Sequence, residues 1–290
     1  MRKLFILAAL AASLPLLAAP APAVSSSSSE TADRSLGTLD QPRPDWLTDE
    51  LEAKILAAGP QGVEVPLAGN ITIQPNCLRT APPYAGTAGV SVNAVSAGTC
   101  VVSPHGCTMN FIFTDGTSNY IGTAGDCAGN GKTMIAQVAT RVDPTDTMLV
   151  TLAAIGNVVK SWNNGIGKDF ALVKIDPAFK VVPGVSGALG PTGVFCGDPV
   201  GQPVMHYGHG YIFFVEQGYP KFGEVIPDLT LNDAGLAVGD LTHGIAIAGL
   251  PVPGLNFGTD MQEIFNLIGS SYKLVTVDGR LTSCANPLGI

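Results

Sequence analysis

Residues 123–127 read TAGDC, residues 168–175 read KDFALVKI and residues 231–235 read LNDAG. The second stretch places Asp169 directly before the apolar run 170–175, which is typical of a buried strand. The first stretch follows two strand-like runs, 110–113 and 119–122, with an Asp-Gly pair between them. Such a pair predicts a hairpin, so we expect the first two stretches to belong to a β-sheet.

Short strands dominate the rest of the chain. Charged residues make up 13% of the sequence, which also holds 35 glycines and 22 prolines, and this suits strands joined by tight turns rather than long solvated helices. Further strands are expected at 133–138, 147–155, 211–215, 244–248 and 273–277, with a turn at Asp143-Pro144. The number of short strands predicts an all-β sandwich or barrel.

Two helices are expected beside these strands. Residues 45–58 carry Leu47, Leu51 and Ile55 on one helical face and end at Gly59-Pro60. A shorter helix is expected within 259–268.

The N-terminus predicts a signal peptide over residues 1–23. Arg2 and Lys3 precede the apolar stretch 4–17, and residues 21–23 read APA, the small-residue pattern before a cleavage site. The alternative, a membrane anchor, fits less well because a spanning helix needs about 20 apolar residues. We therefore expect export, cleavage after Ala23, and no membrane span once the signal is removed.

Residues 24–60 form a leader with the serine run 25–29 and the first helix, and residues 61–290 form the main β domain. The helix either covers an edge of that domain or belongs to a pro-segment that is later removed.

Charge and cysteine content narrow the function. The net charge of −8 and pI near 4.8 argue against a nucleic-acid partner and against binding to an anionic membrane surface. Six cysteines in an exported chain predict disulfides, but 15 connectivities remain open, and their spacing does not resemble a structural zinc site. The six are Cys77, Cys100, Cys107, Cys127, Cys196 and Cys284.

The three opening stretches, in this order, resemble the secreted trypsin-like serine peptidases, especially their compact bacterial members. That family has a histidine in a Thr-Ala-Gly-His-Cys segment, an aspartate before a buried Phe-Ala-Leu strand, and a serine in Gly-Asp-Ser-Gly. The stretches 207–210 and 241–243 are similar to segments of the bacterial branch as well. Over about 107–276, the resemblance implies a double β-barrel for residues 61–290, a site in the cleft between the barrels, and a Cys107–Cys127 disulfide.

Carried over residue by residue, the resemblance exposes three departures. Asp169 matches the triad aspartate, and Asp233 matches the aspartate before the serine. Asp126, however, stands where histidine is needed, and Ala234 stands where serine is needed. Asn232 replaces the glycine whose backbone N–H helps to form the oxyanion hole.

These departures remove the chemistry of the family. An alanine methyl group cannot attack a carbonyl carbon, and a carboxyl with a reference pKa near 3.9 is a weaker base than imidazole. Two neighbouring carboxylates would also repel each other until one takes up a proton.

Four alternatives stay open beside the inactive peptidase. The match could be chance similarity in another β protein, or His105, His206, His209 or His243 could supply a relocated base, although each is better explained as structural. Asp126 and Asp169 could begin a calcium site or form a proton-sharing dyad.

The sequence therefore predicts a secreted, catalytically inactive homologue of trypsin-like peptidases that binds a peptide or protein between its barrels and needs no cofactor. The competing functions are an active secreted peptidase with an atypical site and a structural or surface module.

Overall fold

The structure is a computed structural model of the 290-residue chain. It describes residues 41–66, 94–145, 147–164, 167–184, 190–197, 203–206, 211–212, 215–216, 221–224, 236–237, 239–247 and 250–290, all within one compact unit, Leu36–Ile290. The expected signal peptide and residues 231–235 lie outside this set.

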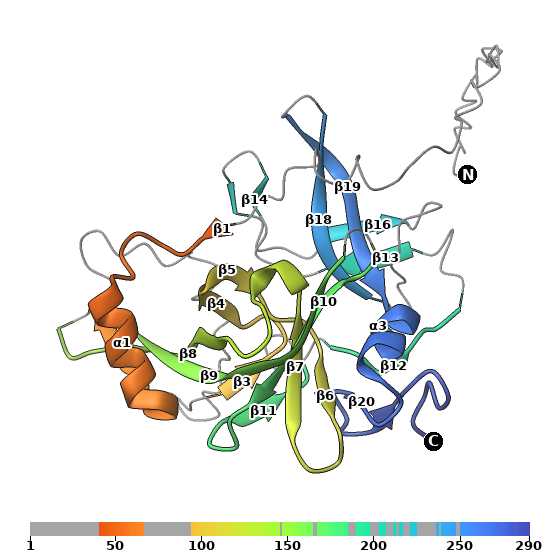
Figure 1. The fold of residues 1–290 in the computed structure, drawn as a ribbon, viewed down its shortest axis with the longest axis horizontal. Coiled ribbons are helices and arrows are strands. Elements are labelled where there is room, and N and C mark those ends of the chain that lie inside the picture. Colours follow the sequence, from red (N-terminus) through yellow and green to blue (C-terminus); the bar gives the residue numbers. More distant parts are fainter. Residues whose placement is uncertain are drawn as a thin grey trace, which may run out of the picture. The chain divides into compact units, whose positions relative to one another are not determined.

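An eleven-stranded sheet dominates the described residues, and each strand pairs antiparallel with its neighbours (Figure 1). The expectation of a mainly β fold is confirmed, and the two-barrel arrangement stays a prediction. In sheet order the strands are β1 (Gln41–Pro42), β5 (His105–Thr108), β4 (Cys100–Ser103), β8 (Thr133–Val142), β9 (Met148–Asn163), β10 (Asp169–Ile175), β7 (Asn119–Thr123), β6 (Ile112–Thr114), β20 (Lys273–Val275) and β21 (Leu281–Thr282), with β2 (Val63–Pro66) also beside β9.

The chain segment that contains β5 and β6 forms hydrogen bonds on two sides, toward β4 and toward β7. Met109, between the two strands, donates its N–H to the carbonyl of Thr99 at 2.9 Å, on the β4 side. Asn110, the next residue, donates its N–H to the carbonyl of Gly122 in β7 at 2.8 Å. One continuous stretch, 105–114, therefore lies beside β4 with its first half and beside β7 with its second half.

Both faces of the central strands are buried, which explains their continuous apolar sequences. Along β10, Ala171 and Val173 enter the largest hydrophobic cluster, whereas Phe170 and Leu172 enter a second cluster on the opposite face. This follows from the two-residue period of a strand. A third cluster, beneath the N-terminal helix, takes the outward residues of β4, β8 and β9, namely Cys100, Val102, Ile135, Val150 and Leu152.

The N-terminal helix α1 (Asp49–Ala58) covers that third cluster and contacts β9. It begins four residues later than predicted because Thr48 is its N-cap, accepting the N–H of Leu51 through its hydroxyl at 3.2 Å. Ile55 is fully buried, and Glu52 accepts hydrogen bonds from the Ser103 hydroxyl in β4 and from Arg43. The helix thus packs on the sheet, as the docking interpretation expected, and its removal as a pro-segment stays a prediction.

Paired strands and a second helix make up the remaining described part. Antiparallel pairs join β13 (Pro203–His206) to β16 (Lys221–Glu224), β14 (Tyr211–Ile212) to β15 (Val215–Glu216), and β18 (Gly239–Ile247) to β19 (Leu250–Asp260). Parallel pairs join β3 (Ala94–Ser96) to β11 (Lys180–Val182) and β12 (Gly193–Val194) to β17 (Leu236–Ala237). The single strand predicted at 211–215 is thus two short antiparallel strands.

Helix α3 (Met261–Ile268) follows β19 directly and ends on the main sheet. Asp260 caps its N-terminus by accepting the N–H of Glu263 at 2.7 Å. At its other end, the ammonium group of Lys160 in β9 donates to the carbonyl of Ile268 at 2.5 Å, where a cation also complements the helix dipole. Among the described residues, no helix combines the length and apolar character needed to cross a membrane.

The predicted hairpin is built around Asp115, between β6 and β7. Gly116 adopts φ +90°, a conformation that favours glycine. The Asp115 carboxylate accepts the Tyr120 hydroxyl at 2.7 Å and the N–H groups of Ser118 and Thr117, each at 2.8 Å. These bonds, with the Tyr120 hydroxyl contributing most, hold the pKa of Asp115 well below its usual range. Burial, followed by the bond to Asp115, raises the pKa of Tyr120 to about 12.

The raised pKa of Tyr120 predicts a loss of stability at alkaline pH. The folded state favours the neutral phenol, so its contribution is complete below about pH 10, the reference pKa of tyrosine, and is lost as pH rises toward the folded value of about 12. Urea unfolding midpoints between these two pH values should fall more steeply for the wild type than for Tyr120→Phe. In a titration followed by phenolate absorbance, one of the six tyrosines should ionise at a higher pH than the others. If this late ionisation is still present in Tyr120→Phe, the raised pKa does not belong to Tyr120.

Candidate functional site

Asp169 lies at the start of β10, with its side chain fully buried. One carboxylate oxygen, Oδ1, accepts the backbone N–H of Gly125 at 2.5 Å and that of Asp126 at 3.2 Å. Both donors belong to the 3-10 turn η2 (Gly125–Cys127), which follows β7. The antiparallel pairing of β7 with β10, which aligns Thr123 with Ala171, brings this turn to the carboxylate.

Glycine is required at position 125 because the chain passes too close to β9 for a side chain. A Cβ atom there would lie 1.8 Å from the carbonyl oxygen of Trp162 and 2.7 Å from Oδ1 of Asp169. The hydroxyl of Ser161, also in β9, donates to the Gly125 carbonyl at 3.0 Å. The turn is therefore held from both β9 and β10.

A disulfide fixes the far end of the same turn. Cys127 is joined to Cys107 of β5, the pair that the resemblance implied. A second disulfide joins Cys196 to Cys284, a pairing that the sequence left open, and Cys100 is disulfide-bonded as well.

Thr259 attaches strand β19 to the site. Its hydroxyl accepts the backbone N–H of Asp169 and donates to the backbone carbonyl of the same residue, both at 3.0 Å. Thr259 is fully buried in β19, opposite Asp240 of β18. A residue 90 positions along the chain therefore completes the hydrogen bonding of the Asp169 backbone.

The structure brings together two of the predicted site residues, Asp126 and Asp169. Asp126 is half-buried in η2, and its backbone is bound by the Asp169 carboxylate. Asn232, Asp233 and Ala234 lie outside the described residues, so their convergence with this turn stays a prediction. At position 126 the turn carries a carboxyl side chain.

The histidines considered as relocated bases lie in different elements. His105 is half-buried in β5, and its Nδ1 atom is enclosed without a hydrogen-bond partner. His206 lies in β13, and His243 lies within β18 rather than before a strand as expected. His209 is outside the described residues. No group of three or more histidine, cysteine or acidic side chains is placed to hold a metal ion in the parts of the chain that the structure describes.

Sequence reasoning missed Gly125 and Thr259 as parts of this site. Gly125 stands within the quoted TAGDC stretch, so its signal was visible but had no stated role. Thr259 carried no signal, because only the folded chain brings it to Asp169.

Comparisons with known proteins do not assign the chain to a family. Its sequence matches no family model, and a search of curated proteins gave no match.

Replacing Asp169 should destabilise the fold because two buried backbone N–H groups lose their hydrogen-bond acceptor. Asp169→Ala leaves the N–H groups of Gly125 and Asp126 without their acceptor, which should cost about 3 kcal/mol in urea unfolding. Asp169→Asn keeps one carbonyl-type oxygen and should lose less than half as much. Equal losses in the two variants would show that these N–H groups do not depend on the side chain.

Thr259→Val tests the attachment of the second half of the chain. Valine has nearly the shape of threonine but lacks the hydroxyl, so the backbone N–H and carbonyl of Asp169 each lose a buried partner. We expect a loss of about 1–3 kcal/mol in the free energy of unfolding. Thr259→Ser retains the hydroxyl and serves as the matched control, and a valine variant as stable as the serine variant would contradict this role.

Proposed function

We propose that the chain is a secreted homologue of trypsin-like serine peptidases that no longer cleaves substrates and instead binds a peptide or protein segment. The observation that carries this proposal is the bond between the buried Asp169 carboxylate and the backbone of Gly125 and Asp126. A triad aspartate acts by orienting the residue that serves as base. Here the carboxylate holds the turn in which that base would stand, and the turn carries Asp126 instead.

Strand pairing supports the first of two β-barrels. The sheet order runs from β5 through β4, β8, β9, β10 and β7 to β6, and β5 and β6 belong to one continuous stretch. In the proposed barrel these strands close into a ring, because the stretch 105–114 pairs with β4 through β5 and with β7 through β6. Small and medium side chains suit the interior of such a ring. The largest cluster supplies them from six successive strands, β4 to β6 in the sheet order, including Val101, Ile121, Ala136, Ala153, Ala171 and Val173.

The second half of the chain supports a cleft rather than a single barrel. Thr259 of β19 joins this half to Asp169. In the proposed arrangement the cleft runs past η2, between the first barrel and a second one formed by the strands after β12. Such a cleft can pair with an extended peptide through backbone hydrogen bonds.

Two substitutions account for the proposed loss of chemistry. Ala234 has no nucleophilic atom, and Asp126 cannot serve both as base toward serine and as partner of an aspartate in the way that imidazole does. Export fits the signal-like N-terminus and the disulfides Cys107–Cys127 and Cys196–Cys284, because disulfides persist in oxidising compartments.

A fluorophosphonate probe for activated serines tests the loss of catalysis. The protein purified from culture medium should begin at Val24, remain unlabelled by the probe, and leave casein intact. Labelling or casein cleavage that is lost in Asp169→Asn would overturn the proposal in favour of an active peptidase.

Restoring the family residues tests the placement of the site. The triple variant Asp126→His, Ala234→Ser and Asn232→Gly should react with the probe, and adding Asp169→Asn should reduce that reaction. Ala234→Ser alone, which lacks the base, is the matched control. A folded triple variant that reacts no faster than this control would contradict the family placement.

Peptide binding separates the proposed function from a structural module. Immobilised wild-type protein should retain extended peptides from a casein digest, identified by mass spectrometry. If no peptide is retained above a blank surface, the structural or surface module becomes the better account.

A further inference from the structure

The last seven residues, 284–290, form a strap against residues 192–197. We call residues 284–290 the C-terminal strap. The Cys196–Cys284 disulfide holds its first residue, and Val194 donates its backbone N–H to the carbonyl of Pro287 at 2.9 Å. These contacts join segments that lie 88 residues apart in sequence.

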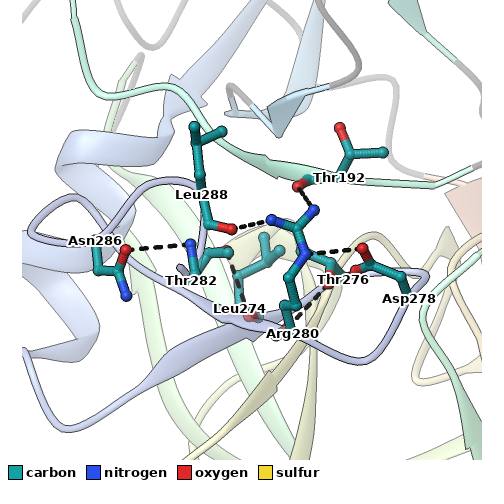
Figure 2. Close-up of polar contacts among 9 residues, drawn as sticks. Thr192, Leu274, Thr276, Asp278, Arg280, Thr282, Asn286 and Leu288 are labelled. Atoms are coloured by element: carbon teal, nitrogen blue, oxygen red, sulfur yellow. Dashed lines mark hydrogen bonds and ion pairs between the residues drawn. The ribbon is translucent and has the colours of Figure 1, made fainter.

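Arg280 lies just before the strap and binds the C-terminal part of the strap through hydrogen bonds (Figure 2). Its guanidinium donates to the carbonyl of Leu288 in the strap and, at 2.8 Å, to the carbonyl of Thr192 in the opposite segment. Asp278 accepts the Nε–H group at 2.7 Å and thereby orients the guanidinium. One planar side chain therefore bridges the strap and the segment on which it lies.

The disulfide lines a surface pocket of about 410 Å³ between the strap and residues 194–197. Cys196 and Cys284 both line it, together with Val194, Phe195, Gly197, Pro287 and Leu288. The strap forms one side of this pocket, so a small molecule that enters it meets the disulfide.

The Cys107–Cys127 disulfide differs at one of its two cysteines. Cys127 is 4% exposed within the largest hydrophobic cluster, whereas Cys107, Cys196 and Cys284 are all half-buried. A thiol must reach a sulfur atom in line with the disulfide to attack it, so access controls the rate of exchange. The two disulfides should therefore differ in their rate of reaction.

The strap is less buried than the residues that precede it. Leu274 is fully buried, and β20 pairs with β6 in the main sheet. Thr282 is fully buried as well, whereas Leu288 is 45% exposed and Ile290 is 92% exposed. Without the disulfide, the strap would retain its hydrogen bonds to Arg280, Val194 and Ser283, while residues up to Thr282 would stay packed.

We propose that Cys196–Cys284 is a site of thiol–disulfide exchange with small external thiols, and that its reduction releases the C-terminal strap and opens the pocket. A thiolate attacks one sulfur, forming a mixed disulfide and breaking the Cys196–Cys284 bond, and the displaced thiolate takes a proton from water. A second thiol group then attacks the mixed disulfide. Two electrons pass to the protein, which gains two thiols, and the two external thiol groups end as a disulfide. This inference does not depend on the proposed peptide binding.

Graded reduction of the folded protein tests the order of exchange. The full mature chain is treated with dithiothreitol under native conditions and quenched with iodoacetamide, and alkylated peptides are counted by mass spectrometry. Cys196 and Cys284 should be modified at least tenfold faster than Cys107 and Cys127. Hydrogen exchange of residues 284–290 should rise with that modification, while β20 stays protected. Equal or reversed rates, or an unchanged strap after modification, would overturn the proposal.

Arginine variants test the role of the network at Arg280. Arg280→Ala should speed reduction of Cys196–Cys284 severalfold, because the variant lacks the guanidinium that binds both Leu288 in the strap and Thr192 in the opposite segment. Arg43→Ala, which removes an arginine bound to Asp49 and Glu52 beside α1, should leave that rate unchanged. A Cys196→Ser and Cys284→Ser double variant should exchange the strap as fast as the reduced protein without any thiol, and a protected strap in this variant would contradict the release.

Discussion

The described architecture depends on the hydrogen bonds of the buried residue Asp169. Its carboxylate accepts two N–H groups of the turn after β7, and its backbone binds the hydroxyl of Thr259. A buried carboxylate is costly unless hydrogen bonds compensate it. Three parts of the chain must therefore be in register at once: the end of β7, the start of β10 and the end of β19.

The strands next to Asp169 are buried on both faces. Phe170 and Leu172 point toward the cluster that contains Phe265 of α3, and Ala171 and Val173 point toward the opposite cluster. Helix α1 covers the third cluster, to which β2 also contributes. The hydrogen bond between Glu52 and Ser103 attaches this helix to the sheet. A sheet that is apolar on both faces is stable only when other elements cover it, and the N-terminal helix and α3 both serve this purpose.

The site and the strap illustrate two uses of distant contacts. At the site, the Asp169 side chain binds the backbone of the turn that carries Asp126, so the shape of the turn does not depend on the Asp126 side chain. At the strap, a disulfide and one arginine hold a segment with exposed apolar side chains. The first arrangement is buried and resists local opening, whereas the second is accessible and its stability is local.

The sequence by itself determined the local features. The run after Asp169 predicted β10, the Asp-Gly pair predicted the hairpin, and the spacing of Leu47, Leu51 and Ile55 predicted α1, because strand alternation, turn geometry and helical period act over a few residues. The resemblance also implied that Asp126 and Asp169 are neighbours. Only the tertiary structure decided that Thr259 binds Asp169, that Gly125 admits no side chain, and that Cys196 pairs with Cys284. Those contacts join residues tens of positions apart, and no local period records which distant residues the fold brings together.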